Sequence, residues 1–512
     1  MKLNTKRTIL VGFAFFLICT FWQAYDSIIP MILTNKFGMS QTWSGVIMAI
    51  DNVLALFMLP LFGTLSDKCK SRRGRRTPFI LAGTIVAVAA FVSLSFVDAA
   101  QLKNISHISA IDDPAALETI YDSQMDAKLQ TPEGESFVLK DVFTREEFTS
   151  IRLQLEDKST NPDYTNYVVP ARQACAAAAT QADPSALILF IALLLILLIA
   201  MATFRSPAVA LMPDVTIKPL RSKANAIINL MGTAGGILVL VMGIVFSTGA
   251  AKNAMMTYIG FFGIVAGVMA ASLIAFIATV REPKWAEEMR QDSIRLGIEE
   301  EEAENGEKKG LGKAERMSLI FLLLSIVFWF FGYNAITSKY SVYAANVLDK
   351  DFNTTLLLAQ GAAIVSYIPV GMVASKIGRK KTIMAGVAML AIAFGGAAMI
   401  RSDSPLWLMN VLFCLAGIAW ASINVNSFPM VVEMCSGADV GKYTGFYYTA
   451  SMAAQTLTPM LSGYLMDQAG MTVLFPYGTV FVALAFVTMI FVRHGDSKVE
   501  GKKGLEAFDT DD

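Results

Sequence analysis

The stretch Gly63-Thr64-Leu65-Ser66-Asp67, followed by Arg72-Arg73-Gly74-Arg75-Arg76-Thr77-Pro78, separates two long apolar runs and decides the fold. Clustered cations between two membrane spans mark the cytoplasmic side, because Lys and Arg stay there during insertion. A weaker copy, Gly371-Met-Val-Ala-Ser-Lys376-Ile-Gly378-Arg379-Lys380-Lys381-Thr382, occurs in the second half of the chain. Two copies predict a membrane protein built from an internal duplication.

The composition agrees with a membrane location. Of 512 residues, 54% are hydrophobic and only 16% are charged, whereas a soluble chain carries about 25% charged residues. The apolar residues gather into runs of about 20, the length of one bilayer crossing. The formal net charge is zero, so bulk charge points to no nucleic-acid partner.

Twelve apolar runs are long enough to span a bilayer. In the first half they lie near residues 9–33, 43–65, 77–97, 185–204, 224–247 and 255–280. In the second half they lie near residues 317–342, 354–375, 382–400, 405–432, 443–466 and 471–492. The first run is too long for the core of a signal peptide, so we interpret it as the first span.

The distribution of cations between the loops predicts the topology. The connection after the fourth span carries Arg205, Lys218, Arg221 and Lys223, and the one after the eighth carries Lys376, Arg379, Lys380 and Lys381. Short connections on the other face hold few cations, such as Lys36, Lys252 and Arg401. This asymmetry places both termini in the cytoplasm, and we expect a multi-pass protein of the plasma membrane.

Two segments interrupt the series of spans. Residues 98–184 form a polar, acidic extracytoplasmic insert between spans 3 and 4, either a small ordered cap or a flexible loop. A helical pattern over Arg145–Asp157 favours order. Residues 281–316 contain runs of both charges and predict a solvated cytoplasmic linker. The expected division is therefore 1–280, 281–316, 317–492 and a cytoplasmic tail at 493–512.

Several motifs taken together resemble one known family. Besides the Gly63–Pro78 stretch, they are Arg205-Ser-Pro-Ala-Val-Ala-Leu-Met-Pro213-Asp214, Phe331-Gly-Tyr333-Asn334 and Gly417-Ile-Ala-Trp420-Ala-Ser-Ile-Asn424-Val-Asn426-Ser-Phe-Pro-Met-Val-Val-Glu433. They are similar to the major facilitator superfamily, and within it to the sucrose-transporter-like branch and the glycoside–pentoside–hexuronide:cation symporters. The resemblance extends over all twelve spans.

That resemblance implies an all-α membrane protein with twelve transmembrane helices in two six-helix bundles, which rock about a central cavity. It also implies uptake of a sugar or glycoside coupled to a cation, usually a proton. The sequence departs from the family pattern in two places: the insert at 98–184 is long, and Lys339 stands where a neutral or aromatic residue is expected.

Charged residues inside the spans need an explanation. Asp26 and Asp51 lie in spans 1 and 2, where a carboxylate costs about 2.5 kcal/mol or more. Each lies roughly eight residues from the outer end of its span, or about 12 Å deep, and Lys339 in span 7 lies at a comparable depth. All three are candidates for proton coupling. The alternatives are an ion pair that holds helices together, or a Lys339 that reaches the surface.

A second charged group lies at the cytoplasmic helix ends and predicts a gate. Its members are Asp67, Arg75, Arg76 and Asp214 in the first half, and Arg379 and Glu433 in the second. Gly63 and Gly371 would allow close helix approach beside them. The hypothesis is a set of ion pairs that holds the outward-open state and breaks when the bundles rock. The alternative is a positive loop that sets topology only.

Polar side chains on apolar helices predict a lined cavity. The substrate-binding candidates are Trp22, Gln23, Tyr25, Asn52, Asn229, Tyr333, Asn334, Trp420, Asn424 and Gln455. Sugar hydroxyls need amide and carboxylate partners, and sugar faces stack on aromatic rings. The alternative for any single Asn is an interhelical hydrogen bond worth roughly 0.6 kcal/mol.

Enzyme motifs are absent, and no phosphate-cradling glycine loop with lysine indicates an ATP-driven pump. The leading interpretation is a proton-coupled importer of a disaccharide or glycoside, a monomer in the lipid bilayer that needs no cofactor or metal. The alternatives are proton-coupled efflux of an amphipathic small molecule, and a membrane sensor or scaffold that transports nothing. Intramembrane Asp26 and Asp51 argue against the sensor.

Overall fold

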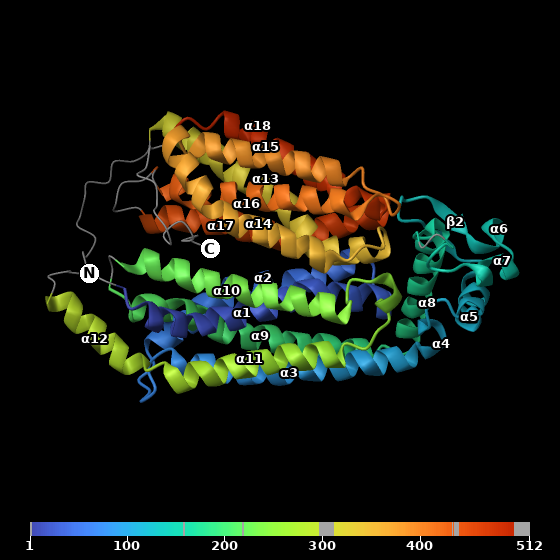
Figure 1. Ribbon diagram of the computed structural model, residues 1–512, viewed down its shortest axis with the longest axis horizontal. Helices are drawn as coiled ribbons and strands as arrows, with labels where there is room; N and C mark the ends of the chain where they lie inside the picture. The colour runs from blue at the N-terminus through green and yellow to red at the C-terminus, as the bar shows by residue number, and fades with distance from the viewer. Residues whose placement is uncertain are drawn as a thin grey trace.

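The computed structural model describes residues 3–156, 159–217, 220–295, 312–432, 434 and 440–495, and within them twelve long helices form the body of the protein (Figure 1). The first six are α1 (Thr5–Met31, continued by the π-helix Ile32–Lys36), α2 (Gln41–Asp67), α3 (Thr77–Asn104), α9 (Ser185–Asp214), α10 (Arg221–Phe246) and α11 (Ile259–Thr279). The second six are α13 (Lys313–Asn346), α14 (Phe352–Ile377), α15 (Arg379–Ala397), α16 (Leu406–Val432), α17 (Val440–Ala469) and α18 (Leu474–Ile490).

Eleven of these helices are long and apolar enough to cross a bilayer, and α17 is the more polar twelfth. Helices are required because the bilayer core offers backbone N–H and C=O groups no water. Pro30, Pro60 and Pro207 lie inside helices, which membrane proteins tolerate because neighbouring groups satisfy the freed carbonyls. The predicted all-α fold is confirmed.

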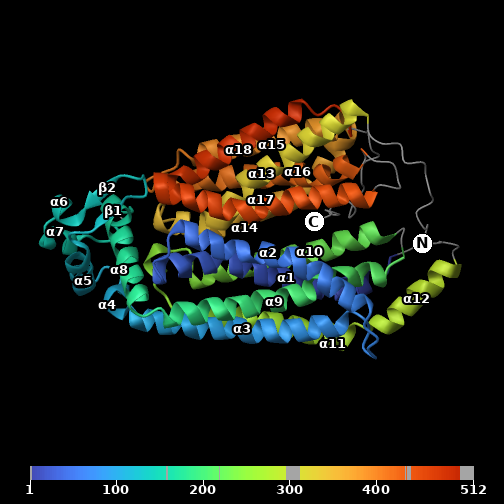
Figure 2. The ribbon, with the colours of Figure 1, turned by 180° about the vertical axis from the view of Figure 1, so that it is seen from behind.

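The helices form two bundles of six that repeat one packing scheme. In the N-terminal bundle α3 packs on α9, α2 on α9, and α11 on both α1 and α3. The C-terminal bundle repeats these pairs as α15 on α16, α14 on α16, and α18 on both α13 and α15. Figures 1 and 2 show the bundles as two layers lying side by side. The predicted duplication is therefore present in the fold.

The two bundles meet through α2 against α17 and through α10 against α14, two contacts related by the same repeat. One end of the bundles bears the insert between α3 and α9 and the other bears α12 (Glu282–Arg295) (Figure 2); we call them the insert end and the linker end. Gln41 and Thr42 of α2 contact Asp467 of α17 at the insert end, and Thr248 after α10 contacts Asn353 of α14 there.

The insert is a small folded cap. Its described elements are α4 (Ser106–Ser109), α5 (Pro114–Gln124), β1 (Lys128–Gln130), β2 (Ser136–Val138), α6 (Leu139–Val142), α7 (Arg145–Ser150), a π-helix (Tyr164–Val168) and α8 (Val169–Ala182). Leu117, Ile120, Phe148 and other apolar residues form a core of its own. Of the two alternatives, the structure supports the ordered cap.

Three expected boundaries differ from the structure. Helix α3 continues to Asn104 and α9 to Asp214, beyond the expected ends of spans 3 and 4. The helix expected over Arg145–Asp157 covers only Arg145–Ser150, because Asp112 accepts the backbone N–H of Leu153 and holds the next residues extended.

The expected linker begins with packed structure. Helix α12 starts at Glu282, whose side chain is buried together with that of Trp285, while residues 296–311 lie outside the described part. Arg7 of α1 packs over the Trp285 ring at 5.3 Å and forms an ion pair with Glu288. The solvated-linker prediction is therefore wrong for the first turn of α12, which packs against the N-terminal bundle.

The crossing of α2 and α17 depends on glycine. A methyl group built on Gly463 would lie 2.2 Å from the Gln41 carbonyl oxygen, and one on Gly45 would lie 2.0 Å from the Pro459 carbonyl oxygen. Small residues allow helix backbones to approach this closely in membranes. Separation of the two bundles at this end would relieve both contacts.

We predict that Gly463→Ala destabilises the protein by about 1–3 kcal/mol, the usual cost of overpacking, measured as a lower melting temperature in detergent. Gly445→Ala is the matched control on the same helix, since a methyl group there meets nothing within 4 Å. Equal melting temperatures for both variants would contradict the close packing.

Candidate functional site

A central cavity of about 540 Å³ lies between the two bundles, within the size range of small-molecule sites. Both bundles contribute walls, from α1, α9 and α10 on one side and from α13, α14 and α16 on the other. Six sequence-predicted residues line it: Trp22, Gln23, Asp26, Asn229, Tyr333 and Trp420. A polar cavity shared by two repeats is the arrangement expected of a carrier.

One wall of the cavity is aromatic. The rings of Tyr333 and Trp420 are stacked in parallel, with centroids 3.6 Å apart and an angle of 6° between planes. Phe330 braces Trp420 edge-on at 5.5 Å. A rigid aromatic surface of this kind offers a face on which an apolar ring face of a ligand can stack.

An amide pair crosses the cavity from one bundle to the other. Gln360 Nε2 on α14 donates to Gln23 Oε1 on α1 at 2.6 Å, and Gln23 Nε2 donates to Ser27 Oγ at 3.1 Å. Sequence analysis did not select Gln360, although it is an isolated amide in the apolar run Leu356-Leu-Leu-Ala-Gln-Gly-Ala-Ala. The pair places one hydrogen-bonding group from each bundle at the same point.

A side pocket of about 230 Å³ adjoins the central cavity and collects the charged candidates. Asp26 and Asp51 both line it, with Asn52 donating to Asp51 Oδ1 at 2.9 Å. Trp22, Asn334 and Gln455 complete the set of predicted residues found there. Two carboxylates therefore share one small compartment, open to the cavity through Asp26 and Trp22, which line both.

Arg205 is the cation of this compartment, and the sequence analysis misplaced it in a loop. It lies inside α9, lines both pockets and stands 5.5 Å from the Trp22 ring. It interacts electrostatically with Asp26 and Asp51. Pro207 and Pro213 suggested a helix end, but the residues between them are apolar, and that signal would have extended the span.

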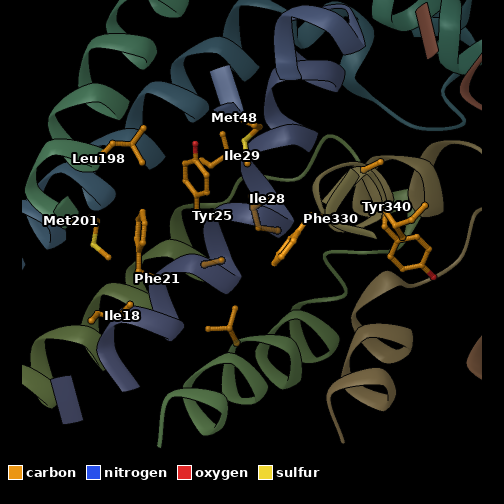
Figure 3. Packing of buried hydrophobic residues seen from close by; sticks show 14 of the residues in the cluster. Ile18, Phe21, Tyr25, Ile28, Ile29, Met48, Leu198, Met201, Phe330 and Tyr340 are labelled. Atoms are coloured by element: carbon orange, nitrogen blue, oxygen red, sulfur yellow. The ribbon is translucent and has the colours of Figure 1, made fainter. Parts of the chain in front are cut away.

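Three predicted site residues lie outside both cavities. Tyr25 is fully buried within the N-terminal bundle, and Figure 3 shows its ring near Leu198 and Met48. Asn424 is buried in α16. Lys339 is fully buried on α13, apart from the carboxylates of the side pocket.

Lys339 belongs to a contact between the bundles that we call the insert-end lock: Gln41, Thr42, Lys339 and Asp467. Lys339 Nζ donates to the Gln41 carbonyl oxygen at 2.7 Å. Asp467 accepts the backbone N–H groups of Gln41 and Thr42, each at 2.8 Å, and the Thr42 hydroxyl at 2.5 Å. A carboxylate from one bundle thus caps the first turn of a helix in the other, which satisfies otherwise orphan donors.

At the linker end Arg76 joins the predicted gate residues of the first half. Its guanidinium contacts Asp214 at 2.8 Å, Asp67 at 2.5 Å and Ser66 Oγ at 2.5 Å. Arg75 adds a longer contact to Asp214 at 3.5 Å. Burial of the Arg76 guanidinium lowers its pKa, but the hydrogen bonds and ion pairs with Asp214 and Asp67 outweigh burial and raise the pKa of Arg76 above its usual value. These described contacts connect α2, the following loop and α9, all in one bundle.

Glu282, which was not among the predicted gate residues, binds the backbone of the same loop. Its carboxylate accepts the backbone N–H groups of Arg75 at 2.6 Å, Arg76 at 2.9 Å and Thr77 at 2.8 Å, and the Thr77 hydroxyl at 2.7 Å. Gly74 has φ +112°, and a methyl group there would lie 2.3 Å from this carboxyl. The motif glycine is required both by its backbone conformation and by Glu282.

The second copy of the motif is built differently. A methyl group on Gly371 meets nothing within 4 Å, whereas one on Gly63 would lie 3.0 Å from Ser206 Oγ, so the expected close approach at Gly371 is wrong. Gly378, directly before α15, has a positive φ of +94°, and Gly74, shortly before α3, has a positive φ of +112°. The predicted partner of Arg379, Glu433, lies outside the described residues.

A buried ion pair, also missed, ties α1 to α3. Lys36 Nζ lies 2.6 Å from Asp98 Oδ1, both side chains are fully buried, and Nζ also donates to the Met256 carbonyl oxygen at 2.8 Å. The Tyr258 ring lies 4.4 Å from the ammonium. Each residue alone resembled a surface charge at a span boundary, so only their spatial proximity shows the pair.

Comparisons with known proteins agree with this architecture. The family model described as Major Facilitator Superfamily matches residues 354–509, and the one described as MFS/sugar transport protein matches residues 11–101. MFS-type transporter ppzB of Metarhizium rileyi is 25% identical over 124 residues, 24% of this chain and 25% of that protein. Sucrose transport protein SUC4 of Arabidopsis thaliana is 41% identical over 51 residues, 10% of each chain. The chain aligns with a quarter or less of these relatives' length.

Solved structures match almost the whole chain. The inward-open xylose transporter XylE from E. coli has a TM-score of 0.58 and 16% identity, covering 97% of this chain and 98% of that one. Peptide transporter POT in complex with alafosfalin has a TM-score of 0.57 and 10% identity, covering 95% and 94%. At sequence identities this low, the structural similarity shows that the fold is shared and nothing more.

Two repeated helical bundles around a common polar cavity have the architecture of multi-pass membrane transporters. Family models described as Major Facilitator Superfamily and as MFS/sugar transport protein match parts of both halves, so the chain is similar to members of that superfamily.

We predict that Glu282→Gln destabilises the loop between α2 and α3 by about 2 kcal/mol, because one carboxylate acceptor becomes a donor that faces backbone N–H groups. The readouts are a lower melting temperature and faster trypsin cleavage at Arg72 and Arg73. Glu287→Gln, on the exposed side of the same helix, should change neither. Unchanged cleavage in Glu282→Gln would show that the carboxylate does not hold the loop.

Proposed function

We propose that the protein is a secondary active transporter that imports a disaccharide or glycoside together with a proton by alternating access. The observation that carries the proposal is the side pocket in which Asp26, Asp51 and Arg205 adjoin a cavity of amides and stacked aromatic rings. The match to the sugar-transport family model and the short alignment with a sucrose transporter support the substrate class.

The proposed orientation follows from charge. The loop between α2 and α3 at the linker end carries Lys68, Lys70, Arg72 and Arg73, and such loops stay in the cytoplasm. On this assignment the cap lies outside the cell and the lock closes the outer side. The hydrogen bonds named above between the bundles lie at the insert end or at the Gln23–Gln360 pair, which supports a cavity directed toward the cytoplasm.

Cavity chemistry supports a polyhydroxylated substrate. Gln23, Gln360 and Asn229 supply donors and acceptors from α1, α14 and α10, and the Tyr333–Trp420 stack supplies an aromatic face. Amides with aromatic rings match the alternating polar edge and apolar face of a sugar. A substrate that bridges Gln23 and Gln360 contacts both bundles at once, which couples its binding to their movement.

Charge balance supports a proton as the coupling ion. With both carboxylates ionised, Asp26, Asp51 and Arg205 carry a net charge of −1; one bound proton makes the compartment neutral. Enclosing an uncompensated charge in a low-dielectric site costs far more than enclosing a neutral group. The loaded, protonated carrier would therefore occlude readily, and release of the proton would follow opening to the other side.

The direct experiment is proton movement in proteoliposomes challenged from outside with a panel of disaccharides. Acidification of the lumen on addition of one of them is the expected result. If no sugar moves protons while an amphipathic drug does, the importer is replaced by an efflux carrier.

We predict that Asp51→Asn and Asp26→Asn each abolish uphill accumulation, because an amide cannot bind and release the proton. Exchange of labelled for unlabelled sugar should persist in at least one of them. Asp183→Asn, which removes an exposed carboxylate near the start of α9, is the control and should accumulate sugar normally. Full accumulation by both site variants would place the coupling elsewhere.

We also predict that Asp467→Asn shifts the population toward an open insert end, because the amide nitrogen repels the N–H donors of α2. Spin labels at Ile188→Cys and Met399→Cys, both exposed in the parent, would report the separation of the bundles, with the five native cysteines replaced by serine. Asp403→Asn, in the exposed α15–α16 loop, is the control.

Lys339→Met separates the two roles offered for this lysine. If Lys339 is part of the lock, Lys339→Met should widen the distribution of distances between the two spin labels, while the ratio of protons to sugar transported stays the same. Loss of accumulation with an unchanged distance distribution would return Lys339 to the coupling machinery.

A further inference from the structure

Another polar pocket, distinct from the side pocket of Asp26 and Asp51, lies over the insert-end lock and has a volume of about 230 Å³. It shares no residue with the central cavity. Three parts of the chain meet around it: the cap through Gln130 and Gln173, the start of α2 through Gln41, and the C-terminal bundle through Asn346 and Asp467. We propose that this pocket is a binding site for a neutral polyhydroxylated ligand the size of one sugar ring, which stabilises the closed insert end.

The lining of the pocket contains four amide side chains, one of which has a buried acceptor without a donor among the described residues. Gln130 donates its amide N–H to the Gly134 carbonyl oxygen, while Gln173 and Asn346 both donate to Asn35 Oδ1, at 3.0 and 2.7 Å. Gln41 is 6% exposed, and its Oε1 accepts no hydrogen bond from the described residues. Buried acceptors left without donors cost free energy, so a ligand that brings several O–H donors is favoured.

The charge of the site selects a neutral ligand. Asp467 is the acidic group of the lining, and its oxygens are already occupied by the first turn of α2. Buried Lys339 interacts electrostatically with Asp467. An anion would be repelled by the Asp467 carboxylate and the amide oxygens, and a cation would be repelled by Lys339. Hydroxyl groups meet neither penalty.

The size of the pocket limits the ligand. Its volume is less than half that of the central cavity, so a ligand that fills it is smaller than one that fills the cavity. If the cavity accepts a disaccharide, as proposed above, a single ring fits the pocket over the lock.

Binding here has a defined consequence. The walls come from both bundles and from the cap, so the complete site exists only while Asp467 caps α2 and the insert end is closed. A ligand that binds one state only shifts the equilibrium toward it. A monosaccharide would therefore slow reopening of the outer side and reduce the maximal rate of uptake without competing for the central cavity.

The test uses the full-length protein in detergent, with the Ile188→Cys and Met399→Cys spin labels and D-glucose as the probe. Glucose should increase the closed population in the parent, whereas glucuronate and glucosamine should not. Two variants remove the site. Gln41→Met removes the amide but keeps the backbone groups of the lock, and Ala174→Phe fills the pocket from α8, where Ala174 lines it. Each should weaken the apparent affinity for glucose by about tenfold or more, Gln41→Met through the loss of one or two hydrogen bonds and Ala174→Phe by occupying the space of the ligand.

Two controls make the result decisive. Ala178→Phe places the same side chain on an exposed position of α8 and should leave the glucose effect intact. Trp420→Ala disables the central cavity, and the glucose effect should persist in it. Because the distance readout needs no transport, failure of sugar uptake would overturn the proposed function alone. An absent glucose effect, an effect unchanged in Gln41→Met and Ala174→Phe, or an effect lost in Trp420→Ala would overturn the pocket.

Discussion

The closed state of this protein depends on one carboxylate that caps a helix across the bundle interface. The first N–H groups of any α-helix lack partners within the helix, and α2 receives its partner from Asp467 of the other bundle. When the bundles separate, water replaces the carboxylate. Exchanging a protein acceptor for water changes the free energy by only about 0.5–1.5 kcal/mol per bond, which suits a carrier whose two states must lie close in energy.

The repeat makes two such interfaces, and they have diverged. The α2–α17 contact uses Asp467 and buried Lys339, whereas at the α10–α14 contact Asn353 donates to Thr248 Oγ1 at 3.0 Å. The cap adds contacts of its own to the C-terminal bundle, from Thr160 to Asp349 and from the Pro132 carbonyl to the Thr472 N–H. The insert therefore adds contacts to both bundles at the end where these two interfaces meet it.

The spans were predictable because lipid imposes helix on every apolar run of about 20 residues. Trp22, Gln23, Asp26 and Trp420 were predictable for the related reason that polar groups in such runs need a cavity. Arg205 was not, since Pro207 and Pro213 imitate a helix end that the packed bundle overrides. The partners of Lys339 and Lys36 were not predictable either, because each is fixed by helices far apart in sequence. Glu282 followed the last apolar run of its half and resembled a solvated charge until its contacts with Thr77 were visible.

Buried charge connects these observations to the proposed mechanism. Lys36 and Asp98 form a buried ion pair, so together they add no net charge to the interior. Lys339 donates to the Gln41 carbonyl oxygen and interacts electrostatically with Asp467. Asp26, Asp51 and Arg205 differ, because two acids share one base in a pocket that opens into the cavity. With both acids ionised, this pocket carries one unit of uncompensated negative charge, which the proposed coupling proton would neutralise. On the proposed mechanism we expect one proton per cycle, whichever carboxylate binds it.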